Sequence, residues 1–100
     1  MRKRRAILEL IKILNKTRDF ISRPENDFTY SGWQDCQDAL DEIDSLILRL
    51  KKNDMPDKLE IKILFAPTGP VQEVSLSGGW SEEYLVLAYK FDGAIAEVYK

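Results

Sequence analysis

The sequence contains no histidine and only one cysteine, Cys36, and these absences narrow its chemistry. Without histidine, a protein lacks the commonest general base, the commonest zinc ligand and the usual activator of a serine or cysteine nucleophile. A single cysteine cannot form an intramolecular disulfide, and Cys36 falls on the apolar face of a predicted helix, where a thiol behaves as a small hydrophobe. We therefore predict a non-enzymatic protein with no metal site and no cofactor.

Several sequence patterns that would indicate a particular class of protein are also missing. No apolar run approaches the about 18 residues that span a bilayer, and Glu9 and Lys12 interrupt the run that follows the basic start. The glycines fit neither a dinucleotide-binding nor a P-loop spacing, and no calcium-binding loop is present. We expect no membrane span, and the low cysteine usage favours the reducing cytoplasm.

The composition is that of one folded domain. The chain has 100 residues, of which 44% are hydrophobic and 32% are charged, with a net charge of −2. A domain of this size buries enough apolar surface to fold without disulfides or metal. We therefore expect a single domain over residues 1–100.

Two long segments have helical periodicity and predict an antiparallel helical hairpin. In residues 3–21, apolar residues recur at helical steps, and extra apolar positions predict that this helix is covered on more than one side. Residues 32–52 follow Ser31, a predicted N-cap, and carry acids in their first half and bases at their end, as the helix dipole favours. Their apolar seam consists of Trp33, Cys36, Leu40, Ile43, Ile47 and Leu50.

The remaining half of the chain is ambiguous between strand and helix. Apolar residues alternate in 59–65, and the breaker at 67–70 precedes residues 71–77, a pattern that we interpret as a small β-hairpin. Residues 71–77 also fit a short helix that begins at Pro70 and ends at Gly78 and Gly79. Ser81 resembles an N-cap of a further helix over 81–92, which Gly93 would end. The predicted fold is mainly α with this small hairpin, and the alternative is an all-α bundle.

Basic residues from both ends of the predicted hairpin should gather at one end of the domain. The dipole of the first helix disfavours positive charge at its start, so helix energetics do not explain the N-terminal cations. Contact with nucleic acid or another anion would explain them, although the net charge is negative and no aromatic residues are interleaved with the cations. The candidate contact residues are Arg2, Lys3, Arg4, Arg5, Lys51 and Lys52.

The interhelical loop and the acidic half of the second helix carry the candidate protein contacts. Phe28 and Tyr30 lie on a polar loop, where aromatic side chains often serve as interface anchors. Asp35, Asp38 and Asp41 would suit a basic partner, although the helix dipole also accounts for them.

By elimination, the sequence favours a small non-catalytic protein-binding module, such as an inhibitor, antitoxin or immunity partner. Two alternatives stay open. One is nucleic-acid binding by the basic end, and the other is self-association through the helical seam or a strand at 59–65.

Overall fold

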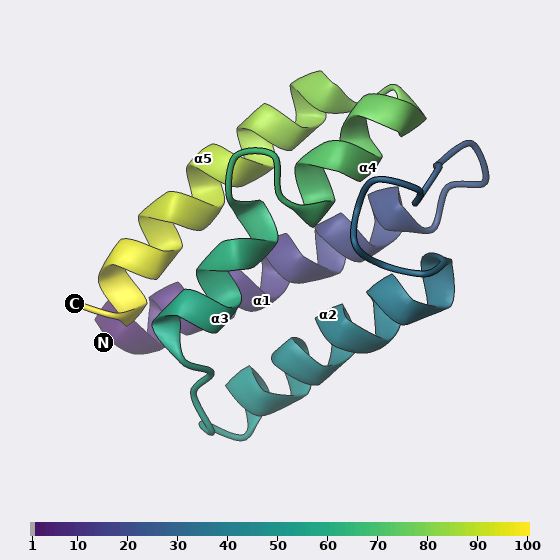
Figure 1. Ribbon diagram of the computed structural model, residues 1–100. Helices are drawn as coiled ribbons and strands as arrows, with labels where there is room; N and C mark the ends of the chain where they lie inside the picture. The colour runs from purple at the N-terminus through teal and green to yellow at the C-terminus, as the bar shows by residue number, and fades with distance from the viewer. Residues whose placement is uncertain (1) are drawn as a thin grey trace.

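The computed structural model describes residues 2–100, which form helices joined by loops. The central helix α1 (Arg2–Ile21) lies between α2 (Cys36–Lys51) and α5 (Ser81–Val98), and both run antiparallel to it (Figure 1). The shorter elements α3 (Lys58–Lys62), the 3-10 turn η1 (Ile63–Phe65) and α4 (Pro70–Gly78) connect α2 to α5. The predicted mainly α fold and the antiparallel helical hairpin are therefore confirmed.

The core lies along α1, because α2 packs on one side of it and α5 on another. Leu10, Leu14 and Ile21 of α1 are fully buried, and each of the three long helices exposes one side to solvent, that of α1 carrying Lys12 and Lys16. This arrangement explains why the sequence of α1 carries apolar residues beyond a single stripe. None of the described helices is long and apolar enough to cross a membrane.

The prediction of a β-hairpin at 59–65 and 71–77 is wrong, since no strand occurs within residues 2–100. Ile61, Leu64 and Phe65 are buried at three- and four-residue spacing, which is helical, while Leu59 and Ile63 are exposed. Pro70 occupies the first turn of α4, as the alternative interpretation had it, and Gly79 caps that helix with a left-handed φ of 79°.

Three predicted helix boundaries also need correction. The N-cap of α2 is Asp35 and not Ser31, whose hydroxyl instead donates to the carbonyl of Phe28 within the loop. The N-cap of α5 is Trp80 and not Ser81, which is the first helical residue, and the helix does not end at Gly93 but continues to Val98. A glycine can remain inside a helix when packing on either side of it supports the helix.

The loop between α1 and α2 is held by the side chain of Asn26. Its Nδ2 donates to the carbonyls of Phe20 (2.8 Å) and Ile21 (2.9 Å), so it caps the end of α1. Its Oδ1 accepts a hydrogen bond from Nε1 of Trp80 at 2.8 Å, and the Trp80 ring stacks on Phe20 with centroids 4.9 Å apart. One amide thus ties the loop to both α1 and the start of α5.

Candidate functional site

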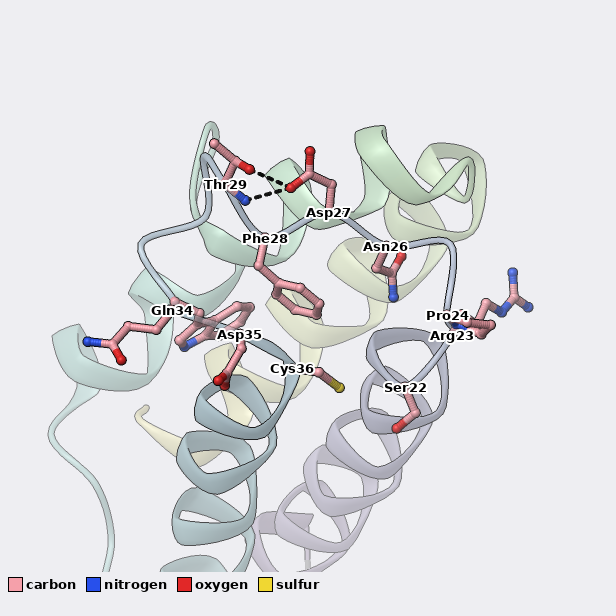
Figure 2. Close-up of a pocket in the computed structure, with 11 residues that line it drawn as sticks. Ser22, Arg23, Pro24, Asn26, Asp27, Phe28, Thr29, Gln34, Asp35 and Cys36 are labelled. Carbon is pink, nitrogen blue, oxygen red and sulfur yellow. Dashed lines mark hydrogen bonds between the residues drawn. The ribbon is translucent and has the colours of Figure 1, made fainter.

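An open hollow of about 690 Å³ lies between the interhelical loop and the start of α2 (Figure 2). Of the predicted contact residues, Phe28 and Asp35 line it, whereas Tyr30, Asp38 and Asp41 do not. Phe28 points into this hollow and packs against the core, whereas Asp27 and Thr29 point outward. The hydroxyl and backbone N–H of Thr29 donate to Asp27, and these bonds lower the pKa of that carboxyl. Tyr30 is 81% exposed, so of the two predicted aromatic contacts only Tyr30 presents its ring to solvent.

The acidic residues of α2 are exposed, but the start of the helix already uses two of them. Asp35 accepts a hydrogen bond from the backbone N–H of Asp38, and Asp38 accepts one from the N–H of Gln34. Asp41 accepts from the side-chain amide of Gln37. Asp35 and Asp38 therefore have a structural role as hydrogen-bond acceptors at the N-terminus of α2. Their contact with a partner stays a prediction.

The structure brings the two basic segments together at the open end of the hairpin. Lys3 and Arg4 from α1 and Lys51 from α2 line one groove of about 630 Å³. Its apolar lining comes from Ile7, Leu8, Ile11 and Leu50. The other predicted cations, Arg2, Arg5 and Lys52, are exposed but do not line this groove.

The sequence reasoning missed the outer surface of α5. Leu85, Val86 and Tyr89 are 63%, 55% and 82% exposed, and Gly93 and Ala96 continue the same stripe along the helix. We call these five residues the α5 outer face. The opposite side of α5 carries the buried residues Tyr84, Leu87, Phe91, Ala94, Ile95 and Val98.

Helix α5 is therefore apolar on both sides, although only its inner side is covered. A surface helix of a monomeric protein normally pairs one apolar stripe with a polar opposite face. The apolar residues of both sides are evident in the sequence, but the sequence alone could not show which of the two sides packs on α1.

The exposed apolar surface extends beyond α5. Leu59 and Ile63, which are 67% and 53% exposed, lie with Leu85 around a hollow of about 570 Å³ between α3, η1 and α5. A contiguous exposed apolar patch of this kind is typical of a contact surface.

Within residues 2–100, no group of three or more His, Cys, Asp or Glu side chains is placed to hold a metal ion. Burial raises the pKa of Tyr84, and the Asp92 carboxylate adds to this shift. The Tyr84 hydroxyl donates to the carbonyl of Phe65 at 3.1 Å, which is a structural bond between α5 and η1.

Comparison with protein-family models, curated proteins and solved structures found no match to this chain.

Proposed function

We propose that this chain is a small non-catalytic protein-binding module whose partner docks on the α5 outer face. The observation that carries the proposal is the exposure of Leu85, Val86 and Tyr89 on a helix whose other side already forms the core. Covering one such side chain contributes roughly 1.5–3 kcal/mol relative to leaving it in water. Tyrosine is also among the residues that most often dominate binding energy at interfaces.

The shape of the α5 outer face indicates what kind of surface it accepts. Tyr89 protrudes into solvent, whereas Gly93 and Ala96 leave the helix backbone accessible one and two turns further on. A partner helix could approach closely over the two small residues and make room for the Tyr89 ring. Packing a large side chain against a small one is the usual way in which two helices interlock.

A narrower role as an inhibitor, antitoxin or immunity partner is consistent with a chain of this size. Such proteins act by occupying the surface of another protein, and this requires a complementary face but no catalytic residues. The single half-buried cysteine suits a reducing compartment, so we place this interaction in the cytoplasm.

The test compares two matched double variants. Leu85→Lys with Tyr89→Lys changes the α5 outer face. Leu76→Lys with Tyr30→Lys makes the same chemical change at a leucine and a tyrosine that are 58% and 81% exposed elsewhere. Each variant and the parent protein would be tagged and used to capture proteins from nuclease-treated native lysate at low and moderate salt.

We expect the parent protein and the second double variant to retain one stoichiometric protein at both salts, and the α5 variant to lose it. Loss in the second variant alone would move the contact to the surface around Tyr30 or Leu76 and refute the proposal. Retention by all three proteins would show that the α5 outer face is not the contact. If only a second copy of this chain is captured, the module is a homo-oligomer and the proposed hetero-partner is wrong.

A further inference from the structure

The groove at the open end of the α1–α2 hairpin combines an apolar floor with cationic edges. Ile7 and Ile11 are partly buried at its base, and Leu8 is 56% exposed beside them. Lys3 and Arg4 stand on the α1 side. We call this the basic groove.

The basic groove continues along the hairpin. Lys51 lines both this hollow and a second one that extends past Leu48 and Asn15. An ion pair between Arg18 and Asp44 bridges the two helices at the far end. The apolar and charged residues therefore continue along the interface between α1 and α2 and are not confined to a single hollow.

The cations of the basic groove have no anionic partner in the part of the chain that the structure describes. The ion pairs found within residues 2–100 involve Arg18, Arg49 and Lys100. Lys3 and Arg4 also lie in the first turn of α1, where the helix dipole opposes positive charge by roughly 0.3–1 kcal/mol per residue. Neither ion pairing within the described residues nor the helix dipole therefore accounts for these charges.

We propose that the basic groove binds an acidic amphipathic helix of a partner protein. Apolar side chains at helical spacing would contact Ile7, Leu8 and Ile11, and carboxylates on the flanks would pair with Lys3, Arg4 and Lys51. A helix laid into an apolar groove is a recurrent mode of recognition, and cationic edges select acidic sequences. This surface is separate from the α5 outer face, so the inference goes beyond the proposed function.

The lining of the basic groove favours a peptide over the other anionic ligands. Single-stranded nucleic acids are usually bound by aromatic side chains on which their bases stack, yet the floor is made of aliphatic side chains and no aromatic ring among residues 2–100 lines the hollow. A membrane surface favours protruding apolar residues, whereas two of the three floor residues on α1 are recessed.

The experiment is an NMR titration of the isotopically labelled full chain. The probe is a synthetic peptide of about 16 residues, enough for about four helical turns, with leucines at helical spacing and glutamates elsewhere. The control peptide carries lysines in place of the glutamates. Arg4→Gln with Lys51→Gln neutralises two groove cations, and Lys62→Gln with Lys90→Gln makes the same change of charge away from the groove.

The proposal expects saturable shifts of the Ile7, Leu8 and Ile11 amides with the acidic peptide only. The affinity should fall at least about tenfold in the Arg4→Gln/Lys51→Gln variant and stay within about twofold in the control variant, since two close charge pairs are lost only in the first. Shifts that are absent, lie outside the groove or appear equally with the basic peptide would overturn the proposal. It would also be overturned if duplex DNA or phosphatidylserine vesicles perturb these amides while the acidic peptide does not. None of these outcomes bears on capture through the α5 outer face.

Discussion

Replacing Asn26 by alanine should be one of the most damaging single changes in a loop of this protein. The amide of Asn26 is the hydrogen-bond acceptor for the indole N–H of Trp80, a side chain with no solvent exposure. The same amide donates to the carbonyls of Phe20 and Ile21 at the end of α1, and the Phe20 carbonyl also accepts from the backbone N–H of Arg23. One substitution therefore removes three hydrogen bonds that join α1, the loop and α5.

The expected loss follows from the burial of each group. Leaving the buried N–H of Trp80 unpaired costs about 1–3 kcal/mol. The two carbonyls add roughly 1 kcal/mol together, because water reaches the end of α1 and replaces part of what is lost. We expect Asn26→Ala to lower the free energy of unfolding by about 2–4 kcal/mol.

Urea unfolding followed by circular dichroism at the helix band measures this loss. Asn15→Ala is the matched control, since Asn15 is exposed on α1 and its replacement should change the free energy by less than about 0.5 kcal/mol. Trp80→Phe completes a double-mutant cycle with Asn26→Ala, and the two changes should be coupled by about 1 kcal/mol or more. A loss below about 0.5 kcal/mol for Asn26→Ala, or strict additivity in the cycle, would refute this account of the loop.

Further predictions concern glycines, a helix cap and a buried tyrosine. In thermal unfolding, Gly93→Ala should raise the melting temperature, because the position is an open helical site where alanine is favoured by about 0.5–1 kcal/mol. Gly78→Ala should lower it, since the new Cβ would collide with the Asn26 Oδ1 and the indole of Trp80; equal effects of the two changes would contradict this. Asp35→Ala should cost about 1 kcal/mol of unfolding free energy in urea and Asp35→Asn much less, whereas equal losses would exclude the capping role. The raised pKa of Tyr84 means that the folded state favours the neutral phenol, so its contribution to stability is complete below about pH 10 and declines as the pH rises through the folded-state pKa. Unfolding measured across this alkaline range should be less pH-dependent in Tyr84→Phe, and an unchanged dependence would assign it to other groups.

The sequence predicted the long helices well because their apolar spacing permits only one period. In α2, the apolar residues from Cys36 to Leu50 fall on one side of a helix and polar residues on the other. A strand would divide the same apolar residues between its two faces. The apolar seam predicted the antiparallel hairpin. The hairpin in turn predicted that Lys3 and Arg4 of α1 lie close to Lys51 of α2.

The strand prediction for residues 59–65 is wrong because their apolar residues fit both a strand period and a helical period. Leu59, Ile61 and Ile63 alternate like a strand, but the apolar Leu64 also permits a helical set of Ile61, Leu64 and Phe65. Packing of η1 against α4, and of Phe65 against Tyr84 and Phe91 of α5, selects the helical set. Only the tertiary structure could show that Leu59 and Ile63 face solvent.

The candidate sites were less predictable than the fold. The dipole explanation for the acids of α2 stays a prediction, and the hydrogen bonds that Asp35 and Asp38 accept from backbone N–H groups are a separate role that the sequence did not indicate. The α5 outer face could not be identified from the sequence, because the type of an apolar residue does not show whether its side chain faces the core or solvent. Gly93 also suggested an early end to α5, which hid the length of the apolar stripe.

Site-specific photo-crosslinking tests the central claim most directly. A benzophenone amino acid would replace Tyr89, whose ring is 82% exposed on the α5 outer face, and in a second protein it would replace Tyr30, which is 81% exposed on the loop. After irradiation in cells, we predict one discrete protein adduct from position 89 and none from position 30. An adduct from position 30 alone, or none from either position, would contradict a partner docked on α5.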